Sequence, residues 1–312
     1  FTESNYSDYS GEAEFSLFTG AIYYISPTGS DFTGNGSANY PYKTIQKGID
    51  VAGDSSLILV ANGTYNESID YSGRELTVAS YFWLDIDTSH ISATTISAVE
   101  GRVVNIDADG SELLGFTVTS GDASQGSGIY ASDQVTIANC IITGNSYTGT
   151  GSGAGIYCAF YSEVTISNCT ITGNSITGNQ SRGAGVYCGS STTVNFTDCT
   201  ITGNTITGDA SHGAGIFAEA SSIMSLSSCV VNENAIVGED AAGAGVHSVG
   251  DLAARPAPWL IQRFGARGEW FHRLALGLDD RNVEVERETK SISSETTFAE
   301  DQASASALAE IL

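Results

Sequence analysis

The chain has few prolines, methionines and basic residues, and it lacks long apolar runs. Its 312 residues include four prolines, one methionine and only twelve lysines and arginines. No apolar run approaches the roughly 20 residues of a membrane-spanning helix, and no charged-then-apolar leader opens the chain. It starts at Phe1 instead of methionine, which predicts a processed or truncated beginning. The six cysteines form no C-x-x-C pair and lack a nearby histidine at ligand spacing, which argues against a metal site.

Basic residues are scarcest before residue 251. That segment holds five lysines and arginines against 25 acids, counted as 36 minus the 11 that follow, so its formal charge is 5 − 25 = −20. Such an acidic chain is a poor partner for nucleic acid or an anionic membrane. We therefore expect no nucleic-acid partner and no membrane span. No cofactor is predicted, and calcium is kept as the alternative.

What the chain has in abundance is repetition. Three consecutive blocks, residues 151–180, 181–210 and 211–240, are near-copies of one another. Apolar and polar residues alternate within them, which is the two-residue period of strands with one buried face. Pairs rich in glycine and asparagine separate the short runs, and no stretch of the blocks has helical spacing. One block cannot bury its apolar side alone, so the blocks are predicted to coil into rungs about 4.8 Å apart around a shared core.

Like residues recur at matching positions, which predicts columns along the stack. The columns are Ala131, Cys158, Cys188 and Ala218; Cys140, Cys169, Cys199 and Cys229; Asn145, Asn174, Asn204 and Asn234; and Gly126, Gly153, Gly183, Gly213 and Gly243. The asparagine amides are expected to bond from rung to rung, and the glycines to repeat one unusual backbone conformation. The cysteines are expected to fill the core as small apolar side chains. Disulfides between rungs and a metal site remain alternatives for them.

Several stretches resemble the right-handed parallel β-helix family, the pectin-lyase-like solenoids of secreted bacterial proteins. They are residues 23–50 and 57–69, typical of the entry to such solenoids, and residues 113–121 and 166–174, typical of their rungs. The resemblance covers roughly residues 20–249. It implies an all-β parallel β-helix and an extracellular or bacterial cell-surface location. It implies little about function, because similar solenoids serve as polysaccharide lyases, glycosidases, adhesins and passive stalks.

The pattern stops within a rung at about residue 250. The rest of the chain holds two of the three tryptophans and seven of the twelve basic residues. Helical spacing there predicts two short helices interrupted at Gly265 to Gly268. The apolar residues with this spacing are Leu260, Phe264, Phe271, Leu274 and Leu278.

This tail resembles a segment of the Y-family DNA polymerases, of the DNA polymerase IV type. The matching residues are Phe264 and Gly265, Asp279 to Arg281 with Val283, and Lys290 to Phe298, whereas Asn282 departs from the family's proline. The family's catalytic carboxylates lie upstream, where this chain has a solenoid, so polymerase chemistry is excluded. With 7 basic and 11 acidic residues, the tail is also a poor binder of DNA. The predicted organisation is a lead-in at 1–20, a parallel β-helix at 21–250 and an unrelated tail at 251–312, as a gene fusion would produce.

Two groups of charged residues are candidates for chemistry. The first joins Asp209 and Glu239, one rung apart, with Arg182 and His212, which share another column. Carboxylates around a cation bind calcium and abstract a sugar proton in polysaccharide lyases, although a solvated acidic turn has the same composition. The second group is the pairs Asp85 and Asp87, and Asp107 and Asp109. Alternation is expected to place each pair on one strand face, as calcium would require, and solubilising charge is the alternative.

A third candidate is an aromatic column. Its members are Tyr130, Tyr157, Tyr187, Phe217 and His247, each next to an inward isoleucine or valine and therefore expected to point outward. An exposed strip of rings would stack on the apolar faces of sugars. It would equally form a structural ladder in which the rings stack on one another.

The sequence thus predicts an extracellular or cell-surface binding or adhesion module, monomeric and directed toward polysaccharide or a cell-surface glycan, with no catalytic activity evident. The first alternative is a carbohydrate-active enzyme of the polysaccharide lyase or glycoside hydrolase type. The second is a non-functional fusion that carries a DNA polymerase IV fragment.

Overall fold

The computed structural model describes residues 18–238, together with residues 257–258, 261 and 269. The chain divides into two units, Phe1–Gly245 and Val246–Leu312. The described strands and helices belong to the first unit, apart from the four helical positions in the tail. The predicted tail helices, along with Gly243, Glu239 and His247, lie outside the described residues.

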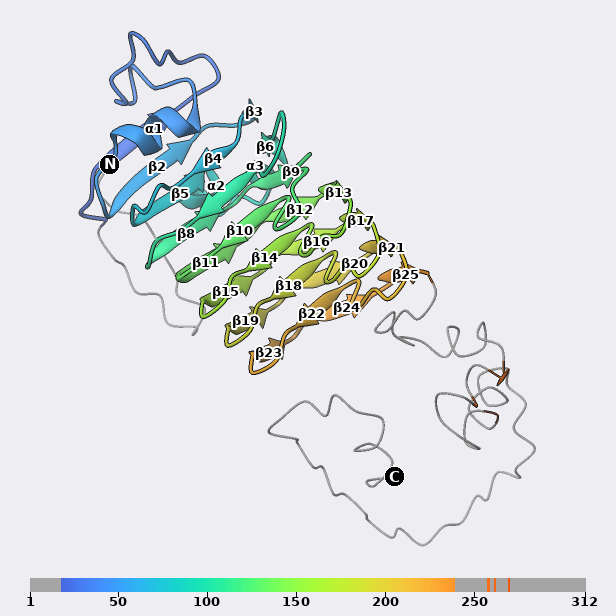
Figure 1. Cartoon of the computed structure of the whole chain (residues 1–312). Helices are drawn as coiled ribbons and strands as arrows, with labels where there is room; N and C mark the ends of the chain where they lie inside the picture. The colour runs from blue at the N-terminus through green and yellow to red at the C-terminus, as the bar shows by residue number, and fades with distance from the viewer. Residues whose placement is uncertain (1–17, 239–256, 259–260, 262–268, 270–312) are drawn as a thin grey trace, which may run out of the picture. The chain divides into compact units, whose positions relative to one another are not determined.

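Residues 18–238 form a solenoid of four parallel sheets, and the chain passes through one strand of each sheet per full rung (Figure 1). The eight-stranded sheet contains β1 (Ile22–Ile25), β2 (Ser56–Val60), β5 (Leu76–Ser80), β8 (Ser111–Leu114), β11 (Gln134–Ala138), β15 (Glu163–Ser167), β19 (Thr193–Thr197) and β23 (Ile223–Ser227). The six-stranded sheet contains β4 (Ile69–Asp70), β7 (Val104–Ile106), β10 (Ile129–Ala131), β14 (Ile156–Cys158), β18 (Val186–Cys188) and β22 (Ile216–Ala218).

The other two sheets follow in the rung. The seven-stranded sheet contains β3 (Gly63–Asn66), β6 (Thr94–Ser97), β9 (Thr117–Thr119), β12 (Ile141–Thr143), β16 (Thr170–Thr172), β20 (Thr200–Thr202) and β24 (Val230–Asn232). The four-stranded sheet contains β13 (Ser146–Thr148), β17 (Ser175–Thr177), β21 (Thr205–Thr207) and β25 (Ala235–Val237). This architecture confirms the predicted parallel β-helix.

The register between rungs repeats without slippage through the block repeats. Val135 pairs with Val164, and Val164 pairs with Val194, so equivalent residues of successive blocks lie side by side. Because side chains alternate between the two faces of a strand, a slip of one residue would turn the whole apolar set outward. The stacking of like residues therefore follows from the burial of one face.

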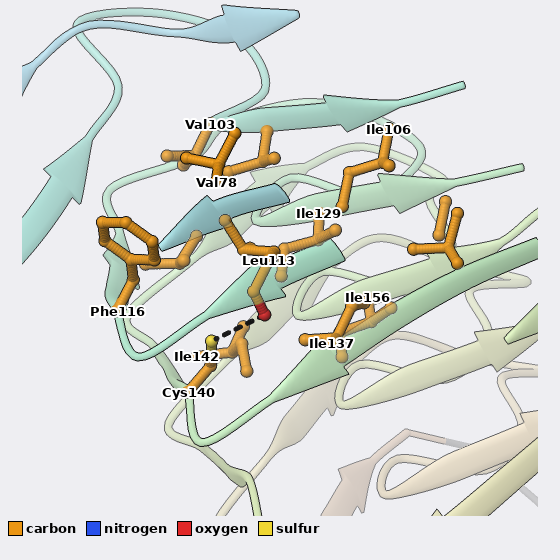
Figure 2. Close-up of a cluster of buried hydrophobic side chains, with 14 of the residues drawn as sticks. Val78, Val103, Ile106, Leu113, Phe116, Ile129, Ile137, Cys140, Ile142 and Ile156 are labelled. Carbon is orange, nitrogen blue, oxygen red and sulfur yellow. Dashed lines mark hydrogen bonds between the residues drawn. The ribbon is translucent and has the colours of Figure 1, made fainter. Parts of the chain in front are cut away.

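The core is the narrow space between the inner faces of the sheets. Figure 2 shows Leu113 and Ile137 of the eight-stranded sheet pointing toward Ile129 and Ile156 of the six-stranded sheet, with Ile142 closing the third side. All five side chains are fully buried. Burying a valine or isoleucine contributes roughly 1.5–3 kcal/mol, which exceeds the net gain from a single hydrogen bond.

Three short helices interrupt the solenoid: α1 (Ile45–Val51), α2 (Phe82–Asp85) and α3 (Ser89–Ala93). At the N-terminal end α1 covers the core with Ile45 and Ile49, both fully buried. Its first turn is capped by the Thr44 side chain and by Glu67, whose carboxylate accepts hydrogen bonds from the backbone of Ile45 and Gln46. The strand pattern did not predict these helices, because an i, i+4 pair such as Ile45 and Ile49 is too short a signal for a helical period.

The opposite end of the described solenoid is not covered in this way. In the rung of β22 to β25, Ile223, Leu226, Val230 and Val237 are between 42% and 66% exposed. Equivalent positions one rung earlier include Phe196, which is fully buried. The described solenoid thus has one helix-capped end and one apolar open end.

The asparagine column lies at the corner between the seven-stranded and four-stranded sheets. The Nδ2 of Asn145 donates to Oδ1 of Asn174 at 3.0 Å, Asn174 to Asn204 at 2.9 Å, and Asn204 to Asn234 at 2.9 Å. Each Oδ1 also accepts the backbone N–H of the preceding asparagine, and Nδ2 of Asn174 donates to the carbonyl of Ile142. Three of the four are fully buried. The amides therefore supply bonding partners at a corner where the strands cannot.

We predict that changing Asn174 and Asn204 together to alanine lowers the free energy of unfolding by about 2–6 kcal/mol. The reason is that each substitution leaves buried backbone and amide groups without partners, at roughly 1–3 kcal/mol per group. Urea-induced unfolding followed by circular dichroism measures the change. The exposed Asn66 and Asn179, changed together to alanine, are the matched control and should cost no more than about 1 kcal/mol. Equal stability of the two double variants would contradict a structural role for the column.

Candidate functional site on the outer faces of the solenoid

The aromatic column forms a continuous stack over the six-stranded sheet. The rings of Tyr130 and Tyr157 are 5.3 Å apart, those of Tyr157 and Tyr187 are 4.7 Å apart, and those of Tyr187 and Phe217 are 5.8 Å apart. The rings are within 15° of parallel. Strand alternation places one ring on each rung, and the in-register pairing brings the rings face to face.

Guanidinium groups lie over both ends of this stack. The Arg102 guanidinium lies 4.4 Å from the centre of the Tyr130 ring, and that of Arg182 lies 5.3 Å from the Phe217 ring. Arg182 is also paired with Glu219 at 2.5 Å, and the same carboxylate oxygen accepts the hydroxyl hydrogen of Tyr187 at 3.0 Å. The column of Glu219 contains Ala159 and Gly189 in the preceding rungs, so no large side chain separates the carboxylate from the rings.

Of the two alternatives for this column, its two central members fit the structural ladder and not the exposed strip. Tyr157 is 2% exposed and Tyr187 is 5% exposed, because their faces cover one another and their edges are covered by neighbouring columns. A sugar ring has no free face to stack on there. Burial raises the pKa of both hydroxyls, and for Tyr187 the bond to Glu219 adds to the effect.

The structure brings together only some of the residues in the first group of charged candidates. Arg182 and His212 do lie side by side in adjacent rungs, through a parallel bridge between their backbones. The ion-pair partner of Arg182 is Glu219, which the sequence reasoning missed, and Asp209 lies in the turn after β21. The only advance signal for Glu219 was a carboxylate in a column otherwise filled by small residues.

The aspartate pairs do not lie on strand faces, so that prediction is wrong. Asp85 ends α2 and accepts the N–H of Asp87, which in turn accepts the N–H of Ser89. The other pair lies after β7, where Asp107 accepts the N–H of Gly73 and Asp109 accepts that of Gln134. Aspartates favour such turn positions because their carboxylates accept local backbone donors. Across residues 18–238 and the four described tail positions, no group of three or more histidines, cysteines and acids is placed to hold a metal ion.

The cysteine column lies just inside the corner between the eight-stranded and seven-stranded sheets. All six cysteines of the chain are free thiols, and all but Cys229 are buried. The thiols of Cys140, Cys169, Cys199 and Cys229 each donate to the carbonyl two residues earlier, at 3.1–3.3 Å. Each rung thus repeats the same compact turn, in which the small cysteine side chain fills the space and its thiol donates a hydrogen bond to a backbone carbonyl.

The outer face of the seven-stranded and four-stranded sheets carries rows of hydroxyl groups, which the sequence reasoning did not single out. We call this surface the threonine face. Its members, on the rungs from β12 to β21, are Thr143, Thr170, Thr172, Thr200 and Thr202 on the first sheet, and Ser146, Thr148, Ser175, Thr177, Thr205 and Thr207 on the second. The rows follow the register, since Thr170 pairs with Thr200 and Thr172 with Thr202 on the adjacent strands β16 and β20. The repeated T-I-T-G-N of the sequence contains these threonines. They did not stand out as functional residues, because threonine is common in ordinary β-strands.

These hydroxyls are unused by the protein itself. Among the described residues, none of the eleven side chains of the threonine face makes a hydrogen bond to another protein group. By contrast, the hydroxyl of Thr117, in the same sheet, donates to the carbonyl of Ile91 at 3.0 Å. The threonine face is therefore a surface of free donors and acceptors repeated on successive rungs.

No helix in the described parts of the chain is long and apolar enough to cross a bilayer.

We predict that stability falls with pH above about pH 10 because of the buried tyrosines. Their pKa is raised in the folded state, so their contribution is complete below the ordinary tyrosine pKa and is lost as pH rises through the folded value. Changing Tyr157 and Tyr187 to phenylalanine should flatten this fall. Urea unfolding at about pH 9 and pH 11 measures it. Changing the exposed Tyr40 and Tyr161 to phenylalanine is the control, and a flattening of equal size there would contradict the explanation.

The solved structures and the curated proteins that resemble this chain are of different kinds. The deglycosylated pectin methylesterase of Aspergillus niger aligns with 78% of this chain and 89% of that chain, at 17% identity and a TM-score of 0.39. Pectin methylesterase from carrot aligns with 74% and 86%, at 14% identity and a TM-score of 0.36. At these values the likeness carries no argument about activity.

The curated relatives match a short segment only. DNA polymerase IV of Xanthomonas euvesicatoria pv. vesicatoria (strain 85-10) is 46% identical over 56 residues, which are 18% of this chain and 16% of that protein. DNA polymerase IV of Dehalococcoides mccartyi (strain CBDB1) is 48% identical over 54 residues, 17% of this chain and 14% of that protein. The chain thus spans about one sixth of the length of these relatives, and the resemblance to DNA polymerase IV is confirmed for a short segment.

Family models match the solenoid. One described as "Protein of unknown function (DUF1565)" matches residues 27–72. Another, described as "Right handed beta helix region", matches residues 82–252, more than half of the chain, and includes the rungs whose sheets are all parallel. The chain therefore belongs to the right handed beta helix family.

Proposed function

We propose that the solenoid is a polysaccharide-binding module of an extracellular or cell-surface protein. The observation that carries this proposal is the threonine face, a surface of free hydroxyls repeated from rung to rung. Sugars are bound through their own hydroxyls, which both donate and accept hydrogen bonds, as threonine hydroxyls do. The aromatic column does not contribute, because its central rings are buried.

A repeated surface suits a polymer better than a single sugar. One hydrogen bond between neutral groups adds only about 0.5–1.5 kcal/mol net, so a lone contact gives negligible affinity. Contacts repeated on linked sugars add up, because each further contact is made within an already bound chain. The arrangement also favours binding over catalysis, since the half-exposed Arg182 is engaged by Glu219 and by the Phe217 ring.

We predict that changing Thr172 and Thr202 together to lysine abolishes retention of the protein by immobilised polysaccharide. The long charged side chains would cover the row and displace the hydroxyls from contact. Affinity electrophoresis through gels that contain soluble polysaccharides measures the retention.

The matched control places lysines on a different outer face. Thr165 and Thr193 lie on the eight-stranded sheet, and the same pair of substitutions there should leave retention unchanged. Equal loss in both double variants would indicate a general effect of added charge and would contradict the assignment to the threonine face.

We also propose that residues 251–312 are an unrelated fragment, joined to the solenoid because two unrelated reading frames were brought together, as in a mis-assembled or recombined gene. The support is the similarity to DNA polymerase IV, confined to less than a fifth of the chain, next to a repeat that stops within a rung. Sequencing of the source DNA across codons 240–265 with long reads tests the junction. An uninterrupted junction in independent isolates would contradict fusion by mis-assembly.

Truncation gives a further prediction at the protein level. A chain that ends at residue 250 should keep its β circular dichroism, unfold no earlier than the full chain, and run as a monomer in size-exclusion chromatography. The reason is that the described core lies entirely within residues 18–238. Loss of the last rungs on truncation would mean that the tail stabilises the open end.

A further inference from the structure

From the charge and spacing of the threonine face we infer that its ligand is an uncharged polysaccharide lying along the solenoid axis, with one sugar on each rung. This inference rests on the proposed function and specifies the ligand class of the same site. The charge of the threonine face indicates the class of polymer, and the spacing of its hydroxyls from rung to rung indicates the direction in which the polymer lies. The residues at the two ends of the row indicate how many sugars are bound.

The threonine face is neutral in a molecule that is otherwise strongly acidic. Its eleven side chains are hydroxyls, and Ile141 is the apolar residue in their midst. The turns beside it carry Asp198 and Asp209, while the whole chain has a formal charge of −24. An acidic polysaccharide would therefore meet like charge at the rim and no compensating cation on the face.

The basic residues of the solenoid lie elsewhere. Arg102 and Arg182 lie over the aromatic stack of the six-stranded sheet, where ring faces and hydrogen-bond acceptors already engage them. Lys43, Lys47 and Arg74 lie near the N-terminal end, before β5. Within residues 18–238 no lysine or arginine belongs to the strands of the threonine face. Charge complementarity thus favours an uncharged partner.

The direction of the chain follows from the two spacings of the surface. Along the axis, equivalent hydroxyls recur once per rung, at about 4.8 Å, as between Thr172 and Thr202. This spacing is close to the advance per residue of an extended chain of pyranoses, so sugars and rungs stay nearly in step over a few rungs. Across the rung the row ends after three residues at the buried asparagine corner, where Gly173 has a left-handed backbone with φ of 64°. Across the rung, Thr172 and Ser175 are therefore separated by a corner, and a polymer running across the strands would not meet hydroxyls at one constant spacing.

The ends of the row bound the ligand. In one row Thr143 pairs with Thr172, Thr172 with Thr202, and Thr202 with Asn232, which gives four polar side chains on four rungs. On the N-terminal side the next position of the row is Thr119, on the rung where α3 packs against β9 and its Ile91 carbonyl accepts the hydroxyl of the neighbouring Thr117, so the helix bounds the face there. The face therefore accommodates about four sugars, one for each of these rungs.

The test is calorimetric titration of the full chain with oligosaccharides of two to six sugars. Neutral probes are β-1,4-linked glucose, β-1,3-linked glucose and β-1,4-linked mannose oligomers, and the acidic probes are galacturonate and mannuronate oligomers. We expect neutral oligomers of one of these series to bind, with affinity rising about two- to tenfold per added sugar up to four and then levelling off. Acidic oligomers should not bind at low salt, where repulsion is strongest.

A single substitution tests the placement of the sugars. Thr202→Lys interrupts the row after two rungs, so the affinity should level off at two sugars instead of four. Thr193→Lys, on the eight-stranded sheet, is the matched control and should leave the length dependence as it is in the unmodified chain.

The outcomes separate the inference from the proposal beneath it. Tighter binding of an acidic series would overturn the inference and leave the binding function standing. Neutral binding without length dependence, or with no change in Thr202→Lys, would overturn the axial placement. If no oligomer binds and affinity electrophoresis shows no retention by any polysaccharide, the binding function itself fails.

Discussion

The whole solenoid depends on the in-register pairing of each rung with the next. This pairing alone provides partners for the backbone of strands that are only three to five residues long through the block repeats. Strands of this length would be unstable in isolation, so the stability lies in the stack rather than in any one rung. The core, the asparagine column and the aromatic stack all require that equivalent residues lie directly above one another.

The same pairing gives the outer surfaces opposite characters. On the six-stranded sheet, repetition brings large rings together, and attraction between the rings closes that surface against solvent. On the seven-stranded sheet, repetition brings threonines together, and their short side chains leave the hydroxyls of the threonine face available. One structural rule thus produces a closed face and an open one. The difference lies in the repeated side chain. Aromatic rings stack on the equivalent rings of neighbouring rungs, whereas threonine hydroxyls remain free to bond with a partner in solution.

Much of the fold could be predicted from the sequence because periodic patterns report directly on stacking. Val164 and Ile166 alternate with polar residues and recur in the next block, which indicates both the strand and its neighbour. The helix α1 could not be predicted in the same way, because a helix of two turns with only Ile45 and Ile49 facing the core is too short to show a helical period in the sequence. The aspartates near Asp85 and Asp107 were misplaced, since alternation in sequence looks the same in a turn as in a strand.

The surface was harder to predict than the core. Tyr157 and Tyr187 point away from the core as expected, yet whether an outward ring is exposed depends on its neighbours in space. Glu219 reaches rings in the preceding rung because Gly189 lies between them, and no local pattern announces such a contact. The threonines were overlooked for the opposite reason, since their strand propensity explains them without any function.

The unlike ends of the described solenoid have a mechanical consequence. At one end α1 seals the core with buried isoleucines, whereas at the other the described rungs end with β22 to β25, where several apolar side chains are partly exposed. Tension applied through the C-terminal end would therefore peel the solenoid one rung at a time, starting from β25. Each rung of 30 residues would release about 100 Å of extended chain. The work of extension would then be absorbed in nearly equal steps, and the chain would lengthen before its helix-capped end unfolds.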